Sequence, residues 1–230
     1  MKVLGIETTG EVCGVAVTDE SGLLVERRYR HRMRLVERLV ADVDAALADA
    51  GLALGDLDGI GAGIGPGSLT GVRIGVMTAK TLAAAVGLPA VGIGATVAIA
   101  SDQAAAPEER VVAIVRARPG SVYADLDASP SPPRLMVVGD LVGELARPPV
   151  RPVVLCGEGC VRDGATIAGA LAAAGVAARI GSVEGPRPST VARLAMERLL
   201  AGERPDAIAL APLYVAPPPI DPRAERFAPR

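Results

Sequence analysis

Short apolar runs and longer amphipathic stretches alternate along the first hundred residues. Three apolar runs separated by polar turns predict an antiparallel meander of strands over 2–7, 12–18 and 23–30. The following stretch, 33–50, has leucine and valine at helical spacing and is closed by Gly51, which predicts a helix. The next elements expected are a glycine-rich strand over 57–64, a helix from 68 or 70 to 86, a strand over 88–94 and a helix over 96–106.

The second half repeats this order less clearly, after a break at 106–110. Its apolar runs predict three strands and then an alternation of helices and strands. These elements are strands over 111–118, 120–127 and 134–139, a helix over 140–146, a strand over 152–157, helices over 162–175 and 189–202, and a strand or extended segment over 205–214. Three strands followed by alternation therefore occur twice, although no sequence repeat of fixed period is present.

Two lobes follow from this double order. We expect a first lobe over 1–105 and a smaller second lobe over 106–216. Whether the helix over 189–202 packs back onto the first lobe stays open. The last residues, 217–230, are rich in proline and charge, which predicts a disordered tail.

Composition restricts both the core and the kind of partner. Hydrophobic residues make up 50% of the chain, but only one Phe, three Tyr and no Trp are present, so Ala, Val, Leu and Ile must build the core. The net charge of −2 predicts no strong positive field that would draw the chain to nucleic acid unaided. The amino terminus lacks the apolar segment of a signal peptide, and no apolar run is long enough to span a bilayer. We therefore expect a cytoplasmic protein without membrane contact.

Reactive side chains are few. Cys13, Cys156 and Cys160 have the wrong spacing for a redox or zinc pair and are expected to be reduced thiols. The single histidine, His31, lies in a basic stretch and is interpreted as a surface side chain. A histidine-rich metal site or a Ser–His mechanism would have to use that one residue, so neither is expected.

The segment GIGAGIGPGSLTGVRIG, residues 59–75, raises the question of a nucleotide-binding loop. Its first glycines alternate strictly, so no phase matches the dinucleotide fingerprint G-x-G-x-x-G, and no glycine precedes a lysine as in a Walker loop. Alternating glycine instead removes the side chains from one face of a strand, on which something bulky can lie. The run at 65–67 predicts a sharp turn, and Ser68 or Thr70 can cap the helix that follows.

Small residues recur at every fourth position of that helix, at Gly71, Gly75, Ala79 and Ala83. This small-residue stripe permits the close approach of another backbone, and either a partner helix or this chain's own sheet would explain it. We assign Gly75 and Ala79 to a partner surface, and Gly71 to internal packing near the glycine turn.

Several motifs together carry a resemblance to a known family. The run GPGSLTGVRIG at 65–75 resembles GPGSFTGVRIG, the signature of the bacterial TsaB proteins, also called YeaZ. Further similarities are ETT at 7–9 with CGVAV at 13–17, RAR at 116–118 with VY at 122–123, and PLYV at 212–215. The likeness covers about residues 1–216 and is strongest through residue 95.

The resemblance implies a fold and a function. The fold is an α/β architecture like that of actin, Hsp70 and the sugar kinases, with two ribonuclease-H-like lobes of mixed sheets in βββαβα order. The function is that of a non-catalytic scaffold and dimerization subunit in the complex that forms threonylcarbamoyladenosine beside the tRNA anticodon. The implied partner is a TsaD-type catalytic subunit, which would carry the ATP and the metal, with a TsaE-type ATPase in the complex. This chain would hold no cofactor, contact tRNA indirectly and form a homodimer when alone.

Family members bind TsaD through two helices that correspond here to 33–50 and 70–86. The resemblance and the small-residue stripe together predict the interface residues Leu35, Leu39, Val43, Arg73, Gly75, Val76, Ala79 and Ala83. The structural signature turn comprises Gly65, Pro66, Gly67, Ser68, Thr70 and Gly71. No catalytic residue and no metal ligand are expected.

Other positions depart from the family pattern. Arg34 and Leu35 lie where many members have a histidine nearby, so no role of that histidine is carried over. The acid of the first strand is Glu7 instead of Asp, Arg116 replaces an Asp, and Ala216 replaces an Arg. These changes take away or displace polar groups that chemistry could use, which favours a scaffold over an enzyme.

Two other functions compete with the scaffold. An ATP-dependent kinase or ATPase of the same fold would need acids on the first strand of each lobe, where Glu7 is a poor candidate. In the second lobe, Asp125 or Asp127 would be the candidate acid. A peptidase would use Ser68 as its nucleophile, but that serine has no histidine base and its capping role suffices.

Overall fold

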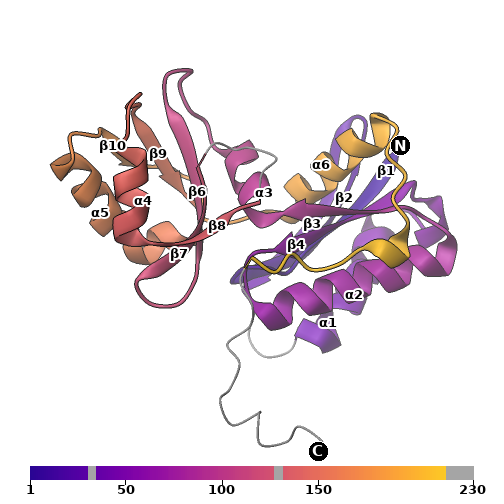
Figure 1. Ribbon diagram of the computed structural model, residues 1–230. Helices are drawn as coiled ribbons and strands as arrows, with labels where there is room; N and C mark the ends of the chain where they lie inside the picture. The colour runs from indigo at the N-terminus through magenta and orange to yellow at the C-terminus, as the bar shows by residue number, and fades with distance from the viewer. Residues whose placement is uncertain (31–34, 127–131, 216–230) are drawn as a thin grey trace, which may run out of the picture.

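The computed structural model describes residues 1–30, 35–126 and 132–215. It consists of two lobes that lie side by side, each built on a five-stranded mixed sheet (Figure 1). The predicted tail over 217–230 and the side chains of His31 and Arg34 lie outside the described residues.

The first sheet begins with the antiparallel meander that the apolar runs predict. Strands β1 (Lys2–Glu7), β2 (Val12–Asp19) and β3 (Gly22–Arg30) pair in sequence. Strands β4 (Gly59–Gly65) and β5 (Ala90–Gly94) then add in parallel on the other side of β1. The strand order is β3-β2-β1-β4-β5, which places the glycine-rich β4 in the interior of the sheet.

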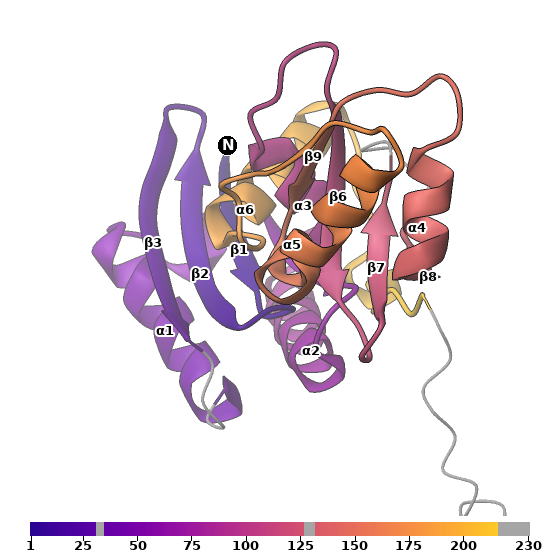
Figure 2. The same cartoon turned by 90° about the vertical axis from the view of Figure 1, so that its left-hand side faces the viewer.

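Helices cover both faces of the first sheet. Helices α1 (Leu35–Asp49) and α2 (Leu69–Val86) lie on one face, with the short 3₁₀ helix η1 (Leu54–Asp56) before β4. The opposite face is covered by α6 (Pro188–Leu200), a helix from the far end of the chain (Figures 1 and 2). The core on the α1–α2 side is aliphatic, as the scarcity of aromatic residues requires.

The second sheet repeats the topology of the first. Strands β6 (Arg110–Arg116), β7 (Ser121–Asp125) and β8 (Arg134–Val137) form a meander, and β9 (Val153–Cys156) and β10 (Ala178–Ile180) add in parallel. Read from β8, the order is β8-β7-β6-β9-β10, which matches the first sheet strand for strand. The two halves therefore share one fold although their sequences show no periodic repeat.

The third helix of each half packs on the sheet of the other half. Helices α4 (Val138–Leu145) and α5 (Glu158–Ala173) lie together against the second sheet, as α1 and α2 lie against the first. Helix α3 (Ala95–Asp102) follows β5 but packs against the second sheet, with Ile99 in a cluster that includes Ala113. This exchange of α3 and α6 ties the lobes together through buried apolar surface.

Several sequence expectations differ from the structure. The segment over 205–214 contains only the 3₁₀ helix η2 (Ala207–Ala209) and otherwise runs without strand pairing along α2 and β4. The helix expected over 162–175 begins earlier, at Glu158, because the glycines around it do not interrupt the helical turns. Strand β10 was missed because three residues are too few for a periodic pattern.

Judged only by its length and mean hydropathy, helix α2 could cross a membrane. Its apolar side nevertheless packs inside the protein, with Val72 and Val76 buried against the sheet. The helix is therefore apolar because it is a core helix of this lobe.

Candidate functional site

The signature turn connects β4 to α2 and packs on the turn between β1 and β2. Gly65 has φ +103°, a conformation that favours glycine, and Ser68 N–H donates to the carbonyl of Thr9 over 2.7 Å. A Cβ on Gly67 would overlap the same carbonyl. Ser68, rather than Thr70, caps the helix, because its hydroxyl accepts the N–H of Gly71 at 3.2 Å.

The bare face of β4 receives two different neighbours. Side chains of α6 lie directly on Gly59 and Gly61, where a Cβ would overlap Leu199 and Ala195. Gly63 instead faces Glu7 of β1, whose carboxylate occupies the space that a side chain would fill. The alternating glycines thus allow α6 and a buried acid to approach the sheet, which answers what the bare backbone is for.

The small-residue stripe of α2 packs inside the subunit. A Cβ on Gly75 would overlap the hydroxyl of Thr8, and a Cβ on Gly71 would overlap the Thr8 carbonyl. The Thr8 hydroxyl also donates to the carbonyl of Gly71 over 2.8 Å. Ala79 and Ala83 are 0% exposed. The assignment of Gly75 and Ala79 to a partner surface is therefore wrong, because this chain's own β1 already fills the approach to Gly75 and neither residue is exposed.

Burial corrects most of the predicted interface in the same way. On both helices the residues selected by apolar periodicity face the sheet, since that periodicity marks the core side of a helix. The predicted interface residues that are buried in this chain are Leu35, Leu39, Val43, Gly75, Val76, Ala79 and Ala83. Arg73 is the exception and is exposed.

The opposite sides of these helices expose a different set of apolar residues. Val36 and Val40 of α1 are 67% and 49% exposed, and Leu69 and Met77 of α2 are 43% and 57% exposed. With Arg73 between the last two, these five residues define what we call the α1–α2 face. The sequence does contain a pattern for this face: apolar residues four positions apart on the side away from the core, such as Val36 and Val40. The prediction of the interface rested on the small-residue stripe instead and missed this pattern.

The segment before the tail extends this face. Leu213 N–H donates to the carbonyl of Ile64 over 2.8 Å, which holds the segment beside β4 and α2. Arg73 Nε donates to the hydroxyl of Tyr214 over 3.0 Å, and the Arg73 guanidinium carbon lies 5.8 Å from that ring's centroid. Since Tyr214 is 51% exposed, the segment adds a half-exposed aromatic residue next to α2.

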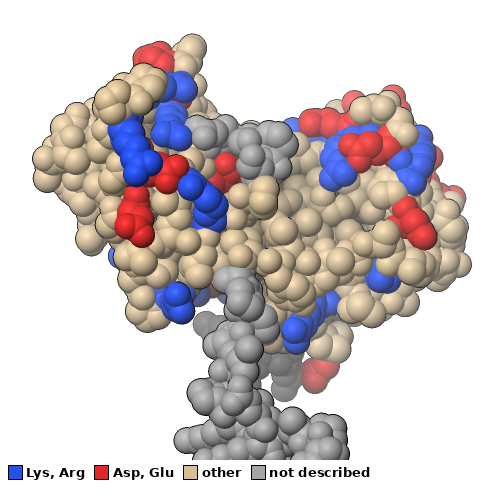
Figure 3. All heavy atoms as spheres, in the orientation of Figure 1, with Lys and Arg blue, Asp and Glu red and all other residues tan. Residues whose placement is uncertain are grey.

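Charges are mixed on the surface around these elements. Figure 3 shows positive and negative side chains interspersed on both lobes, with only scattered charges over the region of α2. The view therefore presents no large area of a single charge sign, in keeping with the net charge of −2.

Glu7 is a fully buried carboxylate between the lobes. Its Oε1 accepts the N–H of Thr9 at 2.5 Å, and its Oε2 has no hydrogen-bond partner among the described residues. Burial raises the pKa of Glu7 to about 7; the hydrogen bonds from Thr9 oppose that shift and the nearby Glu158 carboxylate adds to it. The Glu7 side chain is accommodated at this position because Gly63 has no side chain.

A second carboxylate, Glu158 of the second lobe, packs against the turn between β1 and β2. Its Oε1 accepts the N–H of Glu11 at 2.8 Å, and its carboxyl group packs where a Cβ of Gly10 would lie. Burial raises the pKa of Glu158, while the Glu11 N–H and the Arg116 guanidinium act in the opposite direction. The turn between β1 and β2 thus meets a carboxylate of the second lobe.

Other expected chemistry is dispersed. Asp125 is buried on β7, and Asp127 lies outside the described residues. Cys13, Cys156 and Cys160 are buried free thiols, and burial raises the pKa of each to about 12. Within the described ranges, no group of three or more His, Cys, Asp or Glu side chains lies close enough to hold a metal ion.

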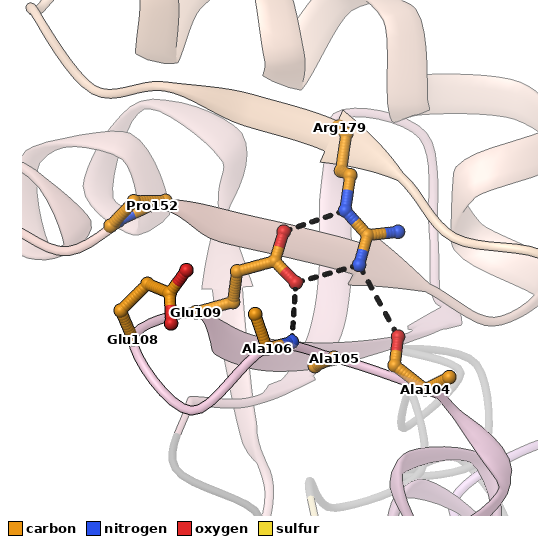
Figure 4. Close-up of a pocket in the computed structure, with 7 residues that line it drawn as sticks. All are labelled: Ala104, Ala105, Ala106, Glu108, Glu109, Pro152 and Arg179. Atoms are coloured by element: carbon orange, nitrogen blue, oxygen red, sulfur yellow. Dashed lines mark hydrogen bonds and ion pairs between the residues drawn. The ribbon is translucent and has the colours of Figure 1, made fainter.

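A shallow cavity of about 440 Å³ lies where the first lobe leads into the second (Figure 4). An ion pair lies in its wall: Arg179 donates to both oxygens of Glu109 over 2.6 and 2.7 Å, and to the carbonyl of Ala104 over 3.3 Å. The Arg179 guanidinium lowers the pKa of Glu109 to about 2. The pair fastens the connecting segment to β10 and leaves its charged groups mutually satisfied.

Sequence comparison finds relatives in one pathway. The family model "tRNA N6-adenosine threonylcarbamoyltransferase", TsaD, matches residues 31–129. The chain is 34% identical to the tRNA threonylcarbamoyladenosine biosynthesis protein TsaB of Escherichia coli over 124 residues, which are 54% of this chain and 53% of that protein. It is 60% identical to the transferase of Cereibacter sphaeroides over 57 residues, which are 25% of this chain and 16% of that protein. The chain thus spans about half the length of its TsaB relative and a sixth of the transferase.

Solved structures share the fold over nearly the whole chain. YeaZ from Pseudomonas aeruginosa has a TM-score of 0.72 at 23% identity, covering 93% of this chain and 99% of that one. A ROK hexokinase from Thermus thermophilus has a TM-score of 0.50 at 15% identity, covering 86% and 100%. The expected α/β, sugar-kinase-like fold with two halves of mixed sheet is confirmed, and each half continues the predicted βββαβα order with one further strand and helix.

Proposed function

We propose that this chain, which is similar to the TsaB proteins of Escherichia coli and Haemophilus influenzae over about half its length and shares the YeaZ fold, is a non-catalytic scaffold subunit in tRNA threonylcarbamoyladenosine formation. It would support a TsaD-type catalytic subunit, which transfers threonylcarbamoyl to the adenosine beside the anticodon. A TsaE-type ATPase would complete the complex, and ATP and metal would be held by the partners.

The observation that carries this proposal is the exposed α1–α2 face. Val36, Val40, Leu69 and Met77 present apolar side chains to solvent on two adjacent helices. Several exposed apolar side chains on two helices in contact are a feature of protein–protein interaction sites in soluble proteins. We propose that this face binds the catalytic subunit, and that in its absence two copies of this chain pair through it.

The polar groups around the signature turn support a scaffold for a separate reason. The Ser68 hydroxyl is engaged in capping α2, so its role in the fold accounts for it without a nucleophile. Glu7 is enclosed by the protein, and Glu158 already uses the Glu11 N–H that an incoming anion could otherwise accept. Ser68 and Glu7 are thus engaged within the first lobe, and Glu158 joins the second lobe to the first, which supports structural roles for all three groups.

A charge placed on the α1–α2 face should prevent partner binding without unfolding the chain. We expect Met77→Glu and Val40→Glu each to weaken binding to the TsaD-type subunit by at least about tenfold, because the partner would have to bury an unpaired carboxylate. Both side chains are exposed, so the melting temperature should change little. Titration calorimetry with the purified catalytic subunit measures the affinity.

Val150→Glu is the matched control, since Val150 is 48% exposed in a loop of the second lobe. It should bind like the unmodified protein. Sedimentation of the chain alone should show a concentration-dependent dimer that Met77→Glu abolishes and that the catalytic subunit displaces. Unchanged partner affinity in both face variants, or a homodimer that persists within the larger complex, would contradict this surface.

An ATP-binding kinase or ATPase remains the competing function. The observation that favours it is the meeting of two carboxylates, Glu7 and Glu158, between the lobes. Under our proposal, titration with Mg·ATP gives no saturable heat, the chain alone does not turn over ATP, and metal analysis finds no stoichiometric zinc or iron. About one metal ion per chain together with an ATPase rate lost in Glu7→Ala would establish the competing function instead.

A further inference from the structure

A cavity of about 640 Å³ opens between the lobes, beside the two carboxylates described above. Its walls come from the start of β2 and the end of β3 in the first lobe, and from β6, α5 and the segment before α6 in the second. Guanidinium groups dominate its charged lining, and they come from both lobes: Arg28, Arg30, Arg116, Arg162 and Arg187.

One carboxylate joins arginines of the two lobes across this cavity. Glu11 of the first lobe lies 2.8 Å from an Arg116 nitrogen of the second lobe and 3.6 Å from an Arg30 nitrogen of its own lobe. The side chains of Glu11, Arg116 and Arg30 are 51%, 46% and 72% exposed. Glu11 therefore acts as an internal anion that two solvent-accessible guanidinium groups share.

The other arginines are only partly neutralised. Arg28 lies 3.4 Å from Glu26, and Arg162 is paired with its neighbour Asp163. Arg187 forms no ion pair with any residue in the described part of the chain. Five arginines and three glutamates line the cavity, and Glu26 and Asp163 pair with Arg28 and Arg162 from outside its wall, so the guanidinium groups not paired from outside are Arg30, Arg116 and Arg187.

We propose that this cavity binds phosphate groups of an RNA backbone, which replace the Glu11 carboxylate on Arg30 and Arg116. Planar guanidinium groups match phosphate oxygens bidentately, and phosphate contacts of this type hold nucleic acids without reading their sequence. The choice of RNA rests on the proposed function, whereas the phosphate chemistry rests on the cavity itself.

The shape of the cavity favours an extended polyanion over a small nucleotide. Sites for small molecules are mostly apolar and enclose most of the ligand. Here the arginines Arg28, Arg30 and Arg116 are 44% to 72% exposed at an open rim. Such a rim can follow a strand of phosphates that continues beyond it, as a chain of linked nucleotides does.

The test is binding of a fluorescein-labelled tRNA transcript to the full chain, followed by anisotropy over a series of salt concentrations. Arg116→Ala should weaken binding by about tenfold and lower the slope of log affinity against log salt by about 1, since one phosphate contact is lost. Glu11→Gln should act in the opposite direction and strengthen binding, because it removes the competing carboxylate. Arg147→Ala, which removes an exposed arginine outside the cavity, should leave both quantities nearly unchanged.

Arg116→Ala and Glu11→Gln should change RNA affinity in opposite directions. A variant that merely misfolds could not show the gain expected of Glu11→Gln. Equal losses in Arg116→Ala and Arg147→Ala, or no gain in Glu11→Gln, would overturn it. Saturable binding of ATP or tripolyphosphate that the tRNA transcript does not displace would overturn the RNA assignment in favour of a small ligand. Affinity for the catalytic subunit should be the same in all three variants, because the α1–α2 face does not include the residues of the cavity. Met77→Glu should lose affinity for the catalytic subunit and retain RNA binding, which distinguishes the two proposals.

Discussion

Replacing Gly75 by leucine is expected to destabilise the isolated protein. The new side chain would overlap Thr8, whose hydroxyl donates to the carbonyl of Gly71, so β1 and α2 would have to move apart. Overpacking of about 1–3 kcal/mol and an unpaired buried hydroxyl of similar cost outweigh the roughly 1 kcal/mol gained because leucine favours helix over glycine. We expect a net loss of about 1–5 kcal/mol, with a melting temperature lower by roughly 10 °C at the middle of that range.

The matched control is Thr81→Leu, which adds bulk to an exposed position of the same helix. Its stability should stay within about 0.5 kcal/mol of the unmodified protein. Urea unfolding measures the change in stability, and calorimetry on the folded fraction measures affinity for the catalytic subunit, which should persist. A fully stable Gly75→Leu protein that fails to bind its partner would contradict the internal packing seen here.

Glu7→Gln is expected to stabilise the protein at pH 8. The pKa of Glu7 is about 7 in the folded state, against an ordinary value of 4.5 for a glutamate in the unfolded chain. The folded state therefore binds more protons than the unfolded state between these values, and this residue lowers stability as the pH rises through that window. The penalty is complete above pH 7 and absent below about pH 4, and the two pKa values correspond to about 3 kcal/mol.

Urea unfolding of both proteins from pH 4 to pH 8 measures this difference. The two should be nearly equal in stability at pH 4, and Glu7→Gln should lead by about 2–3 kcal/mol at pH 8, with a smaller pH slope between. Glu37→Gln is the control, since Glu37 is exposed on α1 and loss of its side-chain charge should change the stability little at either pH. An unmodified protein whose stability rises from pH 5 to pH 7, with no gain in Glu7→Gln, would show that Glu7 is charged at little cost.

The scaffold proposal and the buried carboxylates bear on each other. If the chain has no catalytic role, an acid such as Glu7 can be retained for holding the β1–β2 turn through its hydrogen bond to Thr9. If the Glu7→Gln protein is more stable and still supports the catalytic subunit, the carboxylate of Glu7 is not needed for a chemical step.

The local sequence determined most of the secondary structure and the fold class. Apolar periodicity located the meander over β1 to β3 and helices α1 and α2 within a few residues, because strand and helix spacing depend only on neighbours along the chain. Glycines at 51 and 87, both with positive φ, marked the ends of those helices for the same local reason. Weaker signals, such as the three residues of β10, carried no period to detect.

Only the tertiary structure decided which side of each element is covered. The spacing of Gly71, Gly75, Ala79 and Ala83 requires a close neighbour but does not name it, and Thr8 of β1 proved to be the neighbour at Gly75. The packing of α6 on β1 and the meeting of Glu7 with Glu158 join residues more than a hundred positions apart, and α3 crosses to the other lobe's sheet. Such contacts depend on how the whole chain packs. The exposed α1–α2 face could therefore be identified only once the structure showed which side of each helix is buried.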